Sequence, residues 1–182
     1  IWLLPATKKD RKTQWSAALV QAPDQEGFVS INATLPNQLV EKALKSGVID
    51  ELQDWNYVRR EYSYRGSRWD FLLGNNGTNL VLEVKGVTLV ENGIGYFPDA
   101  VTTRGARHVQ ELAEIAKEPN WVAAVLFIVQ RENVQAIKPC EQIDPNFAKQ
   151  LRYAKESGVL ILGRKCYITL EGITLGEAVP VL

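Results

Sequence analysis

The sequence has no methionine, one histidine and only two cysteines among its 182 residues. Cys140 and Cys166 form neither a disulfide framework nor a metal-spaced pair, and no segment has the pattern of a secretory signal peptide. The longest apolar run, Trp121–Val129, is less than half of the about 20 residues that a membrane-spanning helix needs. We therefore expect a cytoplasmic protein without a membrane segment. The lack of methionine, with Ile1 first, predicts that the natural N-terminus lies upstream.

Net charge is also absent, because Lys plus Arg and Asp plus Glu are equal at 21 each. Overall charge therefore predicts no attraction to nucleic acid or to an anionic membrane, and any such affinity has to be local. A single histidine and the absence of Gly-x-Ser-x-Gly give little support to a Ser-His-Asp hydrolase. The sequence also lacks a dinucleotide fingerprint and a phosphate-binding Gly-Lys-Ser/Thr loop. The apolar fraction of 46% predicts a packed globular core.

The pattern of strand and helix signals divides the chain near Ser30. Strand-like stretches at 1–4, 15–20 and 28–31 come first, so we assign residues 1–30 to a strand-rich N-terminal segment and 31–182 to the main domain. The main domain begins with a helix within 33–47, where Thr34 can cap the start and Gly47 ends it. The later elements are strands at 57–64, 68–73 and 79–90, a helix at 103–117, a strand at 121–129, a helix from Asp144 to Glu156, and strands at 158–162 and 166–170. This order predicts an α/β sandwich built on a mixed sheet.

The dipeptide Asn76-Gly77 is a strong signal for a two-residue hairpin turn. Counting back from this turn pairs Asp70 with Glu83 and Arg68 with Lys85. Because side chains alternate along a strand, the pairing also predicts the two faces of the hairpin. One face carries Arg68, Asp70, Leu72, Val81, Glu83 and Lys85, and the core face carries Trp69, Phe71, Leu73, Leu80, Leu82 and Val84.

Two carboxylates directly opposite each other on a hairpin repel unless a cation lies between them. Mg²⁺ or Mn²⁺ prefers oxygen ligands, so Asp70, Glu83 and the carbonyl of Val84 are the candidate metal ligands. The ammonium of Lys85 points to the same side and can activate a water or neutralise charge on a phosphate. This set predicts phosphodiester hydrolysis. The alternative is a solvated, salt-bridged surface of the hairpin with no chemistry.

An acid in one strand and Glu-x-Lys in the next resemble the restriction-endonuclease-like superfamily, which implies Asp70, Glu83 and Lys85 as the metal and catalytic set. A longer match is more specific. It comprises Asn32-Ala33-Thr34-Leu35-Pro36-Asn37, Ser67-Arg68-Trp69-Asp70-Phe71-Leu72-Leu73, Leu82-Glu83-Val84-Lys85-Gly86-Val87-Thr88-Leu89 and Phe97-Pro98-Asp99-Ala100-Val101-Thr102-Thr103-Arg104-Gly105-Ala106-Arg107-His108. These segments resemble, in order, the bacterial and archaeal sugar fermentation stimulation protein family.

The family resemblance implies an N-terminal OB-fold followed by a nuclease-like domain, with non-specific DNA binding and a regulatory part in sugar metabolism, particularly that of maltose. Residues 1–30 would then be the last strands of a truncated OB-fold, and 31–182 the nuclease-like domain. The resemblance does not decide whether DNA is cleaved or only bound.

The helix that starts near Thr102 supplies a second set of candidates. Its backbone amides can receive a phosphate, and Arg104, Arg107 and His108 can bind the DNA backbone beside the carboxylates. Ordinary solvated arginines and a structural histidine are the alternatives. Asp99 is either a further metal ligand or a helix-start acid.

Further candidates lie elsewhere in the chain. Arg59, Arg60 and Arg68 belong to a local basic strip with interleaved aromatic rings, which can hold DNA or can be an ordinary amphipathic strand. Glu61, Gln130 and Asn37 are additional candidates for the site.

Three functions therefore compete. The first is a DNA-binding protein with a nuclease-like site that uses Mg²⁺ or Mn²⁺, and the second is a non-catalytic DNA-binding regulator. The third is a factor of sugar metabolism that acts through a protein partner. The sequence leaves open whether copies of the chain form a homo-oligomer.

Overall fold

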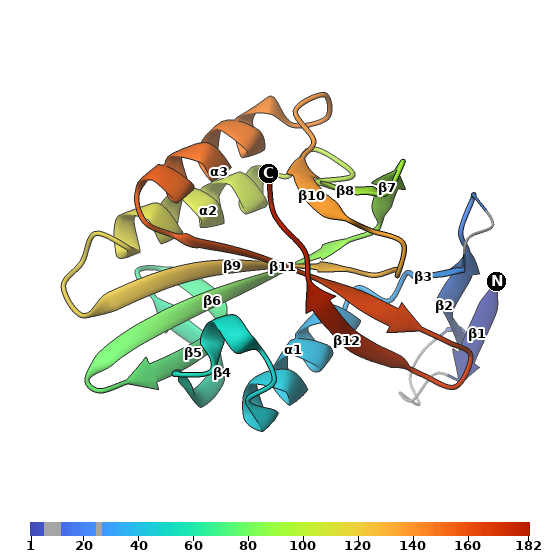
Figure 1. Ribbon diagram of the computed structural model, residues 1–182, viewed down its shortest axis with the longest axis horizontal. Coiled ribbons are helices and arrows are strands. Elements are labelled where there is room, and N and C mark those ends of the chain that lie inside the picture. Colours follow the sequence, from blue (N-terminus) through green and yellow to red (C-terminus); the bar gives the residue numbers. More distant parts are fainter. Residues whose placement is uncertain (6–11, 25–26) are drawn as a thin grey trace.

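The computed structural model describes residues 1–5, 12–24 and 27–182. Within these residues the chain is a mixed α/β protein with three sheets and three α-helices (Figure 1). No helix in the described part of the chain is long and apolar enough to cross a membrane. Residues 6–11 and 25–26 of the predicted N-terminal segment lie outside the described residues.

A six-stranded sheet forms the centre, with the strand order β12-β11-β9-β6-β5-β4. The strands β6, β9 and β11 run parallel, while β4, β5 and β12 pair antiparallel with their neighbours. The bounds are β4 (Asn56–Tyr64), β5 (Ser67–Asn75), β6 (Thr78–Val87), β9 (Trp121–Val129), β11 (Leu160–Ile168) and β12 (Ile173–Ala178).

Helices cover both faces of this sheet. In Figure 1 the helices α2 (Thr103–Ile115) and α3 (Pro145–Glu156) lie together on one side, and α1 (Leu35–Ser46) lies on the other. Two hydrophobic cores result, one containing Val109 of α2 and Leu151 of α3 and the other containing Val40 and Leu44 of α1. A short 3-10 helix (Asp50–Leu52) follows α1.

Two small sheets complete the fold. One contains β1 (Trp2–Pro5), β2 (Trp15–Gln21) and β3 (Phe28–Ser30), and the other contains β7 (Leu89–Glu91), β8 (Ile94–Phe97) and β10 (Ala136–Pro139). The sequence did not predict the short strands β8 and β10, and it predicted a single strand at 79–90 where the chain forms β6 and then β7. The β1–β3 sheet contacts the end of β9, where the Ser30 amide donates to the Gln130 carbonyl and Arg131 pairs with Asp24 at 2.6 Å.

The predicted hairpin register is confirmed from Asn75 opposite Thr78 to Phe71 opposite Leu82. The prediction that only one face of the hairpin belongs to the core is wrong, because helices bury both sides of the sheet. Leu72 and Val81 pack in the α2–α3 core, and Trp69 joins them there rather than lying with Phe71. An irregular step between Trp69 and Phe71 therefore exchanges the expected faces at the point that holds Asp70.

The closing strands also differ from prediction. The chain from Leu160 to Ile168 is one continuous strand through Gly163, and β12 follows where no strand was predicted. A side chain at Gly163 would lie 2.7 Å from the Val179 carbonyl oxygen and from Ile137 Cδ1, so this glycine permits close packing rather than marking a break.

The start of α1 is a further correction. Thr34 occupies the N-cap position, but its side chain caps no helix amide. Instead the Asn32 side-chain oxygen accepts from both the amide and the hydroxyl of Thr34, at 3.0 and 2.9 Å. Gly47 ends the helix with φ of 65°, as predicted.

Candidate functional site

Asp70 lies where the paired part of β5 and β6 ends. The register stops at Phe71 opposite Leu82, and one residue further the Asp70 carboxylate accepts from the Val84 amide at 2.8 Å. The side chain of Asp70 thus replaces a backbone acceptor that β5 no longer offers. Its other oxygen accepts from the Asn37 side-chain amide at 2.6 Å, which ties this carboxylate to the first turn of α1.

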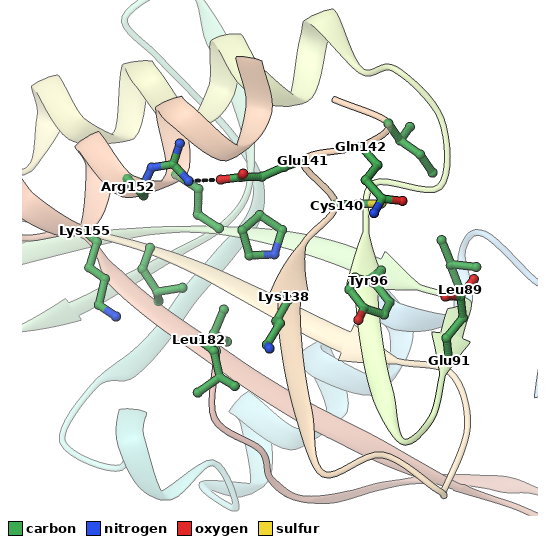
Figure 2. A pocket seen from close by; sticks show the side chains of 15 residues that line it. Leu89, Glu91, Tyr96, Lys138, Cys140, Glu141, Gln142, Arg152, Lys155 and Leu182 are labelled. Atoms are coloured by element: carbon green, nitrogen blue, oxygen red, sulfur yellow. Dashed lines mark hydrogen bonds and ion pairs between the residues drawn. The ribbon is translucent and has the colours of Figure 1, made fainter. Parts of the chain in front are cut away.

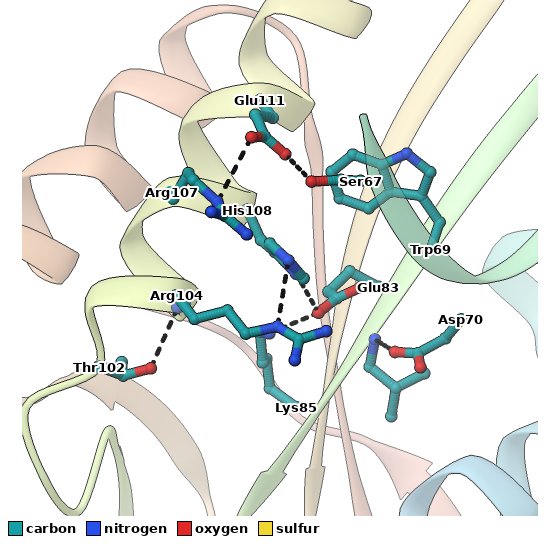
Figure 3. A network of polar contacts seen from close by, with 12 residues as sticks. Ser67, Trp69, Asp70, Glu83, Lys85, Thr102, Arg104, Arg107, His108 and Glu111 are labelled. Atoms are coloured by element: carbon teal, nitrogen blue, oxygen red, sulfur yellow. Dashed lines mark hydrogen bonds and ion pairs between the residues drawn. The ribbon is translucent and has the colours of Figure 1, made fainter. Parts of the chain in front are cut away.

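Glu83 lies one residue before Val84 and has a buried side chain, only 7% exposed. Its Oε1 accepts a hydrogen bond from Lys85 Nζ at 2.6 Å and lies 2.7 Å from His108 Nδ1. Figure 3 shows His108 reaching from α2 to this oxygen, with Arg104 beside the ring. The Arg104 Nε donates to His108 Nε2 at 3.4 Å, so the ring proton belongs on Nδ1 and Glu83 accepts it.

The two carboxyl groups have opposite pKa shifts. Burial raises the pKa of Asp70 above its usual range, and the nearby charge of Glu83 raises it further. Burial also acts to raise the pKa of Glu83, but the His108 hydrogen bond and the charge of Lys85 outweigh burial, so this pKa lies below its usual range. Repulsion between two carboxylates therefore remains at the site, and a cation bound between them would relieve it.

The sequence did not predict the contacts that surround His108 on this face of α2. The Trp69 ring, which is fully buried, lies 5.4 Å from the His108 ring between centroids. Ser67 donates a hydrogen bond to Glu111, and Arg107 Nε lies 3.5 Å from the same carboxylate. Glu111 follows His108 by one helical turn, so helical periodicity offered a signal for its position on this face.

The start of α2 is capped by the Thr102 side chain. The Thr102 hydroxyl accepts from the Gly105 amide at 3.0 Å, as the predicted cap requires. The Thr102 amide, however, donates to Asp144 at 2.8 Å, and the same carboxylate accepts from the Phe147 amide at the start of α3. The Thr102 and Gly105 amides therefore have protein acceptors, and the buried carboxylate of Asp144 would repel a phosphate nearby. Phosphate binding at this helix start stays a prediction, and these contacts disfavour it.

The basic candidates on β4 and β5 are exposed to solvent. Arg59, Arg60 and Arg68 are exposed, and β4 is an edge strand as the DNA-binding interpretation requires. Arg60 pairs with Glu41 of α1 at 3.0 Å, and Arg68 lies 4.0 Å from Glu61.

Glu61 itself has a positive φ of 51° and an exposed side chain, and no hydrogen bond joins it to the two carboxylates in the described part of the chain. The aromatic rings that would lie between the arginines of the basic strip already pack against other parts of the protein. Trp69 is buried, and Tyr62 and Tyr64 stack against Trp121 in the described structure.

Neither Asp99 nor Gln130 makes a hydrogen bond to Asp70, Glu83, Lys85 or His108 in the described part of the chain. Asp99 is exposed and accepts from the Thr88 hydroxyl at 3.3 Å. Gln130 is buried beside Gly86, and its side-chain oxygen has no hydrogen-bond partner within the residues that the structure describes.

The donor set fits an oxygen-preferring cation. No group of three or more His, Cys, Asp or Glu side chains in residues 1–5, 12–24 and 27–182 is placed to hold a metal. Two carboxylates from adjacent strands and the Val84 carbonyl are nevertheless sufficient for Mg²⁺, which keeps several waters and binds through one or two carboxylates. The residues present therefore fit such an ion, whereas a site that requires three protein carboxylates does not form.

Comparison with known proteins gives consistent matches. The sequence model described as "Sugar fermentation stimulation protein RE domain" matches residues 34–172. The sugar fermentation stimulation protein homolog of Shouchella clausii is 42% identical over 182 residues, which are 100% of this chain and 78% of that protein. The homolog of Acetivibrio thermocellus is 43% identical over 166 residues, 90% of this chain and 70% of that protein.

A solved structure shares the fold. The structure of Pyrococcus furiosus SfsA in complex with Ca²⁺ matches with a TM-score of 0.88 and 27% sequence identity. The match covers 99% of this chain and 76% of that chain. The mixed α/β arrangement with several sheets is therefore common to both.

Proposed function

The chain belongs to the sugar fermentation stimulation protein family, and on this premise we propose that it is a DNA-binding protein with a nuclease-like, Mg²⁺-dependent site. The observation that carries the proposal is the position of Asp70 and Glu83 at the end of the β5–β6 pairing, with the Lys85 ammonium 2.6 Å from Glu83. Two carboxylates and an ammonium group are the side chains that metal-assisted phosphodiester hydrolysis uses.

Asp70, Glu83 and the Val84 carbonyl would hold the metal ion, either Mg²⁺ or Mn²⁺. When bound, such an ion supplies Lewis acidity and lowers the pKa of a coordinated water. The related P. furiosus protein was solved in complex with Ca²⁺, another hard cation that takes oxygen ligands, and this supports a divalent site.

The chain's own side chains have separate tasks. Lys85 neutralises charge on a phosphate next to Glu83 and orients a water there. His108 fixes the orientation of Glu83 through its 2.7 Å contact and is a positioning residue. Arg104 and Arg107 on α2, Arg59 and Arg60 on the edge strand β4, and Arg68 on β5 are exposed and would bind phosphates of the DNA backbone.

We extend the proposal to the two parts of the chain. The central sheet, with its mixed strand directions and helices on both faces, would be a restriction-endonuclease-like domain spanning 31–182. The β1–β3 sheet, within 1–30, would be part of an OB-fold. By family the protein would act in the regulation of sugar metabolism, including that of maltose.

One observation favours a second function, a non-catalytic DNA-binding regulator. Both Asp70 oxygens already accept hydrogen bonds from protein donors, and Glu83 Oε1 is shared by Lys85 and His108. A site arranged in this way is stable without a metal ion, and it could serve structure alone while the arginines bind DNA.

Cleavage and binding assays separate the two functions. Plasmid and single-stranded DNA are incubated with the protein and Mg²⁺ or Mn²⁺, and binding of the same DNA is measured by fluorescence anisotropy in EDTA. The variants are Glu83→Ala and, as a matched control, Glu114→Ala on the exposed surface of α2. Cleavage that is lost only in Glu83→Ala supports the nuclease-like site, whereas binding without cleavage supports the regulator. Absence of DNA binding at low salt would refute both and favour a protein partner.

A further inference from the structure

A cavity of about 630 Å³ lies on a part of the surface that the carboxylate site does not include (Figure 2). It is bounded by α3, β11 and the sheet formed by β7, β8 and β10, and none of Asp70, Glu83, Lys85 or His108 lines it. Its volume is in the range of cavities that bind small molecules.

Part of the cavity wall is apolar. Leu151 of α3, which is 6% exposed, lies beside the half-buried side chains of Ile161 and Val181. These residues come from three separate segments and form one continuous part of the lining. An apolar group that enters the cavity removes this surface from water, which favours binding.

The cavity also has two cationic groups without partners. Lys138 of β10 and Lys155 of α3 line it, and neither makes an ion pair or a side-chain hydrogen bond within the described part of the chain. In Figure 2 their ammonium ends lie on either side of Leu182. The third cation in the lining, Arg152, is paired with Glu141. Positive charge is therefore available at Lys138 and Lys155.

We propose that this cavity binds a small amphipathic organic anion. The apolar part of the ligand would lie on Leu151, Ile161 and Val181, and its anionic group would contact Lys138 and Lys155. Hydrogen bonds between ammonium groups and anions are the stronger kind because both partners are charged. Glu91 and Glu141 in the same lining oppose a polyanion, so the ligand class differs from the DNA that the carboxylate site would take.

The test uses hexyl phosphate as the probe and isothermal titration calorimetry of the full chain. Inorganic phosphate and hexanol are the comparison ligands. Hexyl phosphate should bind at least about tenfold more tightly than inorganic phosphate, because burial of roughly two methylene groups already contributes this factor. Lys138→Glu and Lys155→Glu, both at exposed positions that tolerate substitution, should each weaken binding by about tenfold or more.

Two control variants locate the binding. Lys149→Glu changes an exposed lysine of α3 that does not line the cavity, and it should bind hexyl phosphate as the unchanged protein does. Arg104→Ala removes a cation from the carboxylate site and should also leave this binding unchanged. Equal affinity for hexyl phosphate in the Lys138 and Lys155 variants and in the unchanged protein would overturn the proposal. Hexyl phosphate binding no tighter than that of inorganic phosphate would overturn it as well.

Discussion

Replacing Glu83 with Gln tests whether the buried cluster stabilises the fold through charge. The variant keeps the shape of the side chain and an acceptor oxygen for Lys85 and His108, but it removes the negative charge. Breaking a buried ion pair commonly costs 3 to 5 kcal/mol. We expect about 3 kcal/mol here, because the amide oxygen still accepts and the repulsion of Asp70 by Glu83 disappears.

The pH dependence of this loss has a definite sign. The pKa of Glu83 in the folded protein lies below its ordinary value of 4.5, so the ionised group stabilises the fold at pH values above 4.5. That contribution is lost as the pH falls through the lowered pKa of the folded state. The difference in unfolding free energy between the unchanged protein and Glu83→Gln should therefore be largest near neutral pH and decrease on acidification.

Urea unfolding in EDTA, followed by tryptophan fluorescence across this pH range, measures the difference. Glu114→Gln is the matched control, because it removes an α2 carboxylate that is 50% exposed and pairs with Lys117 at the surface. Exposed pairs of this kind contribute little to the free energy of unfolding. Equal losses in the two variants, or a loss for Glu83→Gln that does not change with pH, would refute the account of the Glu83 cluster.

Three further outcomes follow from the structure. Asn37→Ala, which removes the 2.6 Å hydrogen bond to the Asp70 carboxylate, should lower the unfolding free energy by about 2 kcal/mol in urea titrations, and an unchanged midpoint would contradict the role given to this contact. Gly163→Ala should be more destabilising than an exposed glycine substitution, since the new Cβ would lie 2.7 Å from the Val179 carbonyl oxygen, and thermal unfolding that matches the unchanged protein would argue against this packing. Burial raises the pKa of the Cys166 thiol to about 12, so iodoacetamide should modify it in the native protein far more slowly than in urea at pH 8, as mass spectrometry would show, and equal rates would disprove its burial.

Local signals in the sequence predicted the parts of the fold that depend on neighbouring residues. The Asn76-Gly77 turn set the hairpin register over its paired length, and Asp144 and Thr102 cap the helices that they precede. Packing between segments that are far apart in the chain could not be predicted from these local signals. Two strands were predicted at 158–162 and 166–170 because nothing in this segment shows that Val179 packs against Gly163 and that one strand continues through it.

The candidate site likewise combines contacts that the local sequence predicts with contacts that only the folded chain brings together. The spacing of Glu83 and Lys85 along one strand placed both side chains together, and their 2.6 Å contact depends only on strand periodicity. The environment of Asp70 depends on the end of the β5–β6 pairing and on Asn37 of α1, which lies 33 residues earlier in the chain. A strict alternation of faces therefore could not show that Trp69 packs against His108.

The carboxylate of Asp144 joins the starts of two helices, α2 and α3. It accepts from the Thr102 amide at one helix start and from the Phe147 amide at the other, and it is almost fully buried. Rotation of either helix alone would leave a buried charge short of a donor, which is costly. The starts of α2 and α3 therefore share one buried acceptor, so removing the Asp144 carboxylate should weaken the packing of both helices at once.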